Sequence, residues 1–193
     1  IKVNKEQLGV NLIDALSKGA TDGVKLVLNI GGMLLAFIAI ILAINWILID
    51  GIGAVTGLNA YVILSTQGTF EGFSLQYILG QIFRFFAFAI GINWNESLLV
   101  GSLLGQKFVI NEFVGYLSLA EMKASGALSE RAIMISTYAL CGFANLSSIG
   151  IQIGGIGVMA PERRGDLSLL GFRALIGASL ATLMTAAIAG AIF

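Results

Sequence analysis

The segment that decides the fold spans residues 96–121 and reads ESLLVGSLLGQKFVINEFVGYLSLAE. Most of it is apolar, but Lys107, Asn111 and Glu112 lie near its middle. A straight membrane-spanning helix would place both charged side chains near the centre of the bilayer, at a cost of roughly 2.5 to 3.5 kcal/mol each. The pattern therefore indicates a membrane segment that does not cross in one straight helix.

A re-entrant hairpin would avoid this cost. We predict two short helices, at about residues 97–104 and 108–119, which meet at residues 105–107. Polar groups at such a junction face a cavity lined by protein, where irregular backbone is tolerated inside a membrane.

The composition indicates that the whole chain is embedded in a membrane. Of its 193 residues, 57% are hydrophobic and 11% are charged, whereas soluble domains carry about 25% charged residues. The formal net charge is zero, so there is no electrostatic reason to expect nucleic acid as a partner. The partner that this composition favours is the lipid bilayer.

The residue types that carry most enzyme chemistry are scarce. Histidine is absent and Cys141 is the only cysteine. This excludes Ser-His and Cys-His nucleophile pairs, and it excludes the usual ligand sets of zinc and iron–sulfur sites. We therefore expect no catalytic residue, no bound cofactor and no metal site in this chain.

The beginning of the chain carries no recognisable targeting signal. Residues 1–22 mix lysine with aspartate and glutamate and lack the apolar core of a signal peptide. Because the first residue is Ile and not Met, we expect the chain to be a fragment or a processed piece.

Two apolar runs, residues 25–50 and 174–193, are long enough to cross a membrane, since about 20 helical residues span the hydrocarbon core. Residues 51–74 are rich in glycine, threonine and glutamine and predict an exposed connection. Residues 75–94 could span the membrane, but the central Arg84 and many aromatic side chains favour an interfacial helix.

Residues 132–160 are uncharged and long enough to span, but a patch of small and polar residues interrupts them. An unbroken lipid-facing helix would not contain such a patch, so we predict a discontinuous helix. The patch consists of Gly142, Asn145, Ser147, Ser148 and Gly150.

Positive charges in short loops set the orientation. Arg163 and Arg164 place the last loop in the cytoplasm. Phe193, the connection 121–131 and both ends of the hairpin then lie outside. Only a re-entrant segment 97–119 is consistent with that topology.

Three long motifs resemble a known family. The C-terminal half of the concentrative nucleoside transporters strongly resembles the stretches GSLLGQKFVINEFVGYLSL (101–119), LSERAIMISTYALCGFANLSSIGIQIGGIGVMAPERRGD (128–166) and RALIGASLATLMTAAIAG (173–190). The similarity covers nearly the whole chain and is most specific at NEFVGYLSL and ALCGFANLSSIGI. Two features depart from the family pattern: a proline that often precedes the hairpin is absent, and Gly115 stands where alanine is common.

Members of that family are trimers with a scaffold and a mobile transport domain, which contains two inverted repeats, each with a re-entrant hairpin and a broken helix. The resemblance implies an all-α integral membrane fold in which this chain supplies one inverted repeat. Its parts would be a cytoplasmic lead-in (1–23), a scaffold transmembrane helix (24–49), an external connection with an interfacial helix (50–96) and a transport-domain repeat (97–193).

The resemblance also implies ion-coupled import of nucleosides by alternating access, across a plasma or inner cell membrane. In the family, an acidic hairpin residue and the Asn and Ser of the broken helix hold the sugar, near a Phe. The matching positions are Glu112, Phe143, Asn145 and Ser148. Their chemistry suits the vicinal hydroxyls of ribose. The nucleobase contacts and the coupling cation, sodium or proton, would belong to the missing N-terminal half, and the assembly would be a homotrimer.

Other interpretations of the same residues stay open. Glu112 and Lys107 could satisfy each other, or helix ends, without touching substrate. Asn145 and Ser148 could simply join helices across the membrane, and Phe143 could be ordinary packing. For the whole protein, the alternatives are a channel or pore with Glu112 lining the pathway, and a membrane-embedded enzyme or structural subunit.

Overall fold

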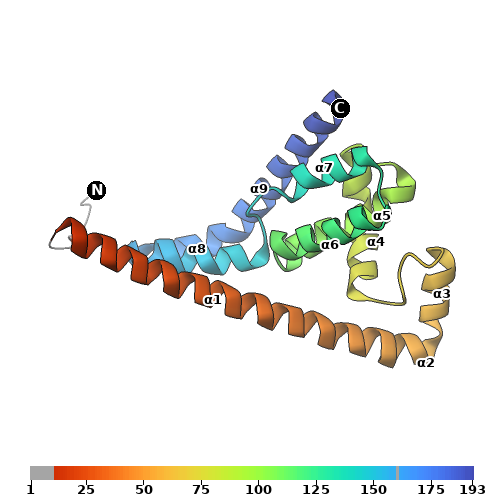
Figure 1. The fold of residues 1–193 in the computed structure, drawn as a ribbon, viewed down its shortest axis with the longest axis horizontal. Coiled ribbons are helices and arrows are strands. Elements are labelled where there is room, and N and C mark those ends of the chain that lie inside the picture. The colour runs from red at the N-terminus through yellow and green to blue at the C-terminus, as the bar shows by residue number, and fades with distance from the viewer. Residues whose placement is uncertain (1–10, 160) are drawn as a thin grey trace. The chain divides into compact units, whose positions relative to one another are not determined.

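The computed structural model describes residues 11–159 and 161–193. Every regular element in these two ranges is a helix, which confirms the all-α class (Figure 1). In chain order the elements are α1 (Leu12–Trp46), the π-helix η1 (Ile47–Gly53), α2 (Ala54–Thr56), α3 (Leu58–Ser65), α4 (Leu75–Ala89), α5 (Trp94–Val109), α6 (Glu112–Ala124), α7 (Glu130–Leu140), α8 (Leu146–Met159), the 3-10 helix η2 (Pro161–Arg163) and α9 (Arg164–Ile192).

The chain divides into two compact units, Ile1–Ile44 and Asn45–Phe193. Two helical stretches of the described residues are long and apolar enough to cross a membrane, Ile38–Thr56 with a mean hydropathy of 2.2 and Arg164–Ile192 with 1.9. Helices α4 and α5 pass the same test only as a pair, and they are bent by 116° at the break between them. These lengths and compositions are those of an integral membrane protein.

Helix α1 begins at Leu12, well before residue 24, where we predicted the transmembrane helix to begin. Asn11 accounts for the early start, because its side-chain oxygen accepts a hydrogen bond of 2.9 Å from the Asp14 backbone N–H, as an N-cap does. The predicted lead-in is therefore helical from Leu12 onward, and residues 1–10 lie outside the described part of the chain.

The connection after α1 is more ordered than its glycine-rich sequence predicts. It contains α2 and α3. Most of its residues are exposed, as predicted, but Val62 of α3 is fully buried. Asn59 bridges the two ends of the connection. Its amide donates to the Ile49 carbonyl oxygen, and its side-chain oxygen accepts from the Phe73 N–H, both at 2.9 Å.

Glycines bring α4 and α5 into backbone contact. A Cβ atom on Gly101 would lie 2.7 Å from both the Arg84 backbone nitrogen and the Gly80 carbonyl oxygen, closer than real Cβ atoms approach other atoms. On Gly105 it would lie 2.5 Å from the Cβ of Leu79. Small residues that let helices approach this closely are typical of membrane interiors, so the packing of α5 on α4 requires glycine here.

Helices α5 and α6 form a hairpin whose turn consists of Ile110 and Asn111 (Figure 1). The chain then returns to the start of α5, where the Ser129 backbone N–H donates to a Glu96 carboxylate oxygen at 2.6 Å. The hairpin thus has a base, at Glu96 and Ser129, and a tip, at the turn.

The prediction that the two helices meet at residues 105–107 is wrong. All three residues are helical and buried within α5. Gly105 packs against α4 and does not break the helix. Lys107 is hydrogen-bonded to other helices, so the helix continues past it. The chain turns instead where the Asn111 side chain caps α6.

The stretch from residue 132 to 160 is interrupted, as predicted. Helix α7 ends at Leu140 and α8 begins at Leu146, and residues 141–145 between them are here called the α7–α8 break. Residue 160 lies outside the described residues.

One hydrophobic core joins the hairpin to α7 and α9. Its buried members include Leu103 of α5, Ile135 of α7 and Ala186 of α9, all at 0% exposure. Helices α7 and α9 lie side by side in Figure 1. This core holds the body of the hairpin against α7 and α9.

Candidate functional site

The tip of the hairpin presents Glu112 as the first residue of α6. Asn111 before it has an extended backbone, is buried, and accepts a hydrogen bond of 3.0 Å from the Val114 N–H. Because Asn111 supplies the cap, the carboxylate of Glu112 can turn to a neighbouring element. The N-terminal end of α6 also favours a negative charge at this position.

Asn145 lies directly before α8 and caps it as Asn111 caps α6. Its side-chain oxygen accepts from the Ser148 N–H at 2.7 Å, and the Ser148 hydroxyl donates to the Asn145 carbonyl oxygen at 2.6 Å. Asn145 is 0% exposed and Ser148 is 3% exposed. These bonds hold the side-chain amide of Asn145 in one orientation.

A hydrogen bond between side chains joins the two helix starts. The amide Nδ2 of Asn145 donates to Oε2 of Glu112 at 2.7 Å, although 33 residues separate them in the chain. Within the part of the chain that the structure describes, the other carboxylate oxygen of Glu112 has no hydrogen-bond donor. One carboxylate oxygen of Glu112 therefore remains to accept a hydrogen bond from a ligand, and the second amide hydrogen of Asn145 remains to donate one.

The structure thus brings three of the four predicted site residues together: Glu112, Asn145 and Ser148. Phe143 lies in the same break, two residues before Asn145, and is 55% exposed. The exposed ring provides an apolar surface close in the chain to Asn145.

Two further residues belong to this region, and sequence reasoning gave neither a role. The Ser147 hydroxyl lies 2.6 Å from Oδ1 of Asn145 and 3.3 Å from the Ile110 carbonyl oxygen, so it connects the break to the tip of the hairpin. Thr182 of α9 accepts a hydrogen bond of 3.0 Å from Lys107. Ser147 lies in the polar patch that predicted the break, but nothing in the sequence around Thr182 distinguishes it from other threonines in apolar helices.

Lys107 is 4% exposed. Its ammonium donates to the Ala139 carbonyl oxygen at 2.9 Å and to the Thr182 hydroxyl oxygen at 3.0 Å. No salt bridge joins it to Glu112 in the described ranges. The structure therefore does not support the alternative in which these two charges satisfy each other as a direct ion pair.

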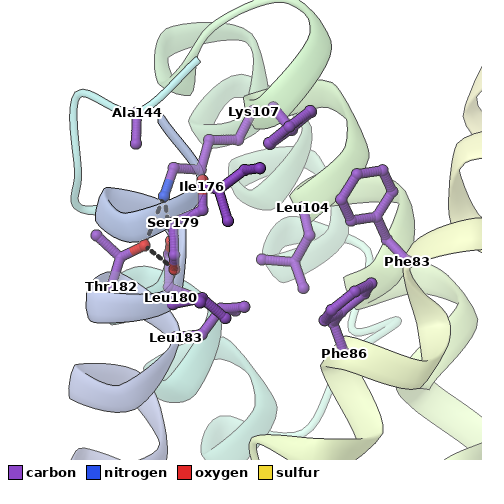
Figure 2. Close-up of a pocket in the computed structure, with 12 residues that line it drawn as sticks. Phe83, Phe86, Leu104, Lys107, Ala144, Ile176, Ser179, Leu180, Thr182 and Leu183 are labelled. Carbon is purple, nitrogen blue, oxygen red and sulfur yellow. Dashed lines mark hydrogen bonds between the residues drawn. The ribbon is translucent and has the colours of Figure 1, made fainter. Parts of the chain in front are cut away.

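A cavity of about 250 Å³ lies beside Lys107, between α4 and α5 on one side and α9 on the other (Figure 2). Phenylalanine and leucine side chains face one another across it, and Lys107, Ser179 and Thr182 supply its polar groups. None of the four predicted site residues lines it, and its apolar walls do not suit a sugar. The described residues also contain no cluster of three or more Asp, Glu, Cys or His side chains suited to a metal ion.

Comparison with known proteins decides the family. The family model described as "Na+ dependent nucleoside transporter C-terminus" matches residues 2–190. This chain belongs to the Na+ dependent nucleoside transporter family. The relatives of this family to which it is similar are transporters and not enzymes.

Relatives and solved structures in this transporter family match almost the whole chain. It is 43% identical over 189 residues to the uncharacterized transporter YutK of Bacillus subtilis, covering 98% of this chain and 43% of YutK. It is 38% identical over 196 residues to sodium/nucleoside cotransporter 1 of Rattus norvegicus, covering 95% and 28%. The structure of CNTnw in an inward-facing substrate-bound state matches with a TM-score of 0.81 at 42% identity, covering 94% of this chain and 41% of CNTnw. The chain thus spans less than half the length of these three relatives.

Proposed function

We propose that the complete protein imports nucleosides across a cell membrane together with a cation, and that this chain supplies the ribose-binding side of the site. The observation that carries the proposal is the hydrogen bond of 2.7 Å between the half-buried Glu112 and the buried Asn145. Acidic residues within membrane segments are costly and mark substrate or ion pathways. Here the acid is partnered by an amide at a helix break, the kind of place where transporters form substrate sites.

The chemistry of the pair matches a sugar with vicinal hydroxyls. The unpartnered oxygen of Glu112 can accept from one hydroxyl, and the second amide hydrogen of Asn145 can donate to its neighbour. The Ser148 hydroxyl already donates to the Asn145 carbonyl at 2.6 Å and accepts from the Asn145 N–H at 3.3 Å, so its role is to accept one bond from substrate with its remaining lone pair while it holds Asn145 in place. Phe143 would cover the apolar face of the sugar ring.

The proposal assigns a membrane role to each part of the chain. The α5–α6 hairpin is re-entrant, and together with the α7–α8 break it forms the mobile transport-domain repeat, residues 97–193. Residues 24–49 belong to a scaffold helix at the contact of a homotrimer in the plasma or inner membrane. Alternating access then moves the repeat past the scaffold. The nucleobase contacts and the coupling cation, which we take as sodium from the family, bind outside this chain.

Uptake of radiolabelled uridine by cells carrying the complete transporter tests the proposal. Glu112→Gln removes the negative charge of the acceptor, and Asn145→Ala removes the donor of the same hydrogen bond, so we expect the KM for uridine to rise about tenfold to a hundredfold. Glu121→Gln is the matched control, because Glu121 is an exposed carboxylate on the same helix. Unchanged KM and maximal rate in both site variants, at normal expression, would refute the assigned contacts.

The same assay separates a transporter from a channel. A transporter predicts uptake that saturates with uridine concentration, is competed by unlabelled uridine, and falls when choline replaces sodium. Uptake that rises linearly and shows no competition would instead support a pore lined by Glu112.

A further inference from the structure

Three helices meet at the ammonium group of Lys107. The residue belongs to α5, one of its acceptors is the Ala139 carbonyl oxygen of α7 at 2.9 Å, and the other is the Thr182 hydroxyl of α9 at 3.0 Å. Figure 2 shows the side chain directed away from the phenylalanines of the cavity and towards Thr182. At 4% exposure, this charge depends almost entirely on protein partners.

The carbonyl that Lys107 contacts is available because the helix breaks. In an unbroken helix the Ala139 carbonyl would accept from the N–H of Phe143, but Phe143 lies in the α7–α8 break. The last carbonyls of a helix carry partial negative charge and need other donors. An ammonium group supplies both a hydrogen bond and the opposite charge.

The other side of the break has the opposite polarity. Asn145 caps the N-terminal end of α8, where unpaired N–H groups carry partial positive charge. Glu112, on the far side of the hairpin turn from Lys107, bonds to Asn145 at this end. The tip of the hairpin therefore presents a cation to the end of α7 and an anion to the start of α8.

We propose that Lys107 is a positioning residue that fixes the α7–α8 break and so sets the Glu112–Asn145 pair in its binding geometry. In other transporters with broken helices, the C-terminal end of a half-helix holds a coupling cation that binds and leaves. In this repeat the Lys107 ammonium, which is covalently part of the chain, occupies the equivalent place at the end of α7. The effect on transport rests on the proposed function, whereas the effect on the break does not.

Cys141 gives a readout of the break that is independent of substrate. It is the chain's only cysteine, it is exposed, and it lies directly after α7. We would measure the rate at which a maleimide labels Cys141 in the complete purified transporter, following the labelled peptide by mass spectrometry. For Lys107→Met we expect this rate to change at least about threefold, because the α7 end loses its donor. Lys123→Met, an exposed lysine on the same hairpin, is the matched control and should leave the rate unchanged.

Uridine uptake gives the second readout. We expect Lys107→Met to raise the KM about tenfold, with a smaller change in the maximal rate per folded molecule. If Lys107 acts through Asn145, the double variant Lys107→Met with Asn145→Ala should have the KM of Asn145→Ala alone. Additive effects would show that Lys107 acts separately and would overturn the inference.

Thr182→Val covers the case in which Lys107→Met does not fold. This change removes one acceptor and keeps the charge, so we expect both readouts to shift in the same direction and by a smaller factor. Unchanged Cys141 labelling in the folded Lys107 variant, or in Thr182→Val if the former does not fold, would overturn the inference. If the unmodified transporter took up no nucleoside, the proposed function would fail, and the labelling result would still decide the role of Lys107.

Discussion

The two ends of the α5–α6 hairpin are held by similar chemistry in different surroundings. Next to the base, two residues after Ser129, the guanidinium of Arg131 in α7 donates to the carbonyl oxygens of Gly91 at 2.6 Å and Gly190 at 2.9 Å. At the tip, the Lys107 ammonium donates to the Ala139 carbonyl at 2.9 Å. Lys107 ties the hairpin to the main chain of α7, and Arg131 ties α7 to the main chain of the segment before α5 and of α9. Arg131 is exposed, however, and Lys107 is buried.

This difference in burial predicts a difference in role. When an exposed hydrogen bond is lost, solvent replaces it and the cost is small. When a buried charged partner is lost, the remaining polar group is left unsatisfied and the local structure must change. The base should therefore contribute to the stability of the fold, whereas the tip should control the geometry of the site.

Disrupting the body of the hairpin should have the largest effect, because both ends depend on it. In Gly101→Ala the new Cβ would lie 2.7 Å from the Arg84 nitrogen and the Gly80 oxygen, which are backbone atoms that cannot move aside. We expect a loss of about 3 kcal/mol of stability, with a lower apparent Tm and little uptake. Thermal unfolding followed by size-exclusion chromatography measures this. An unchanged Tm would mean that α4 and α5 lie farther apart in the complete protein.

Breaking the base alone should have a moderate effect of a different kind. Arg131→Met removes two hydrogen bonds to carbonyl oxygens, and we expect a loss of about 1 kcal/mol in stability. The KM for uridine should stay within about twofold of the unmodified value, since the tip keeps its contacts. A lower apparent Tm together with an unchanged KM would support the assignment of stability to the base and of site geometry to the tip. A rise in KM like that expected for Lys107→Met would show that the base also sets the site geometry.

Much of the fold follows from the sequence, and the misplaced turn of the hairpin has a physical cause. The charges at Lys107 and Glu112 predict a chain reversal in this segment, and the structure contains one. The position of the turn was wrong, because glycine has two uses in membrane helices: it breaks them, and it lets them pack closely. Gly105 serves the second use, and only its distance to Leu79 on another helix reveals this.

Part of the candidate site could also be predicted from the sequence, and part could not. The motifs around Glu112 and Asn145 predict that these residues act together, and the structure joins them by a hydrogen bond. The partners of Lys107 could not be predicted, since Thr182 lies 75 residues away and Ala139 contributes only a main-chain oxygen. A carbonyl freed by a helix break leaves no mark on its own side chain, so sequence patterns do not reveal it.

The smallest effect should come from a second glycine of the hairpin, nearer the tip. In Gly115→Ala the new Cβ would lie 3.0 Å from Cδ2 of Leu140, the end of a flexible side chain that can shift by a few tenths of an ångström. Alanine is favoured over glycine within a helix by about 0.5 to 1 kcal/mol, which offsets the cost of moving Leu140. We therefore expect an apparent Tm within a few degrees of the unmodified protein and normal uridine uptake. If this variant were as damaged as Gly101→Ala, tight packing would extend to the α6 face as well. The proposed contrast between a rigid α4–α5 face and a tip held by polar contacts would then be wrong.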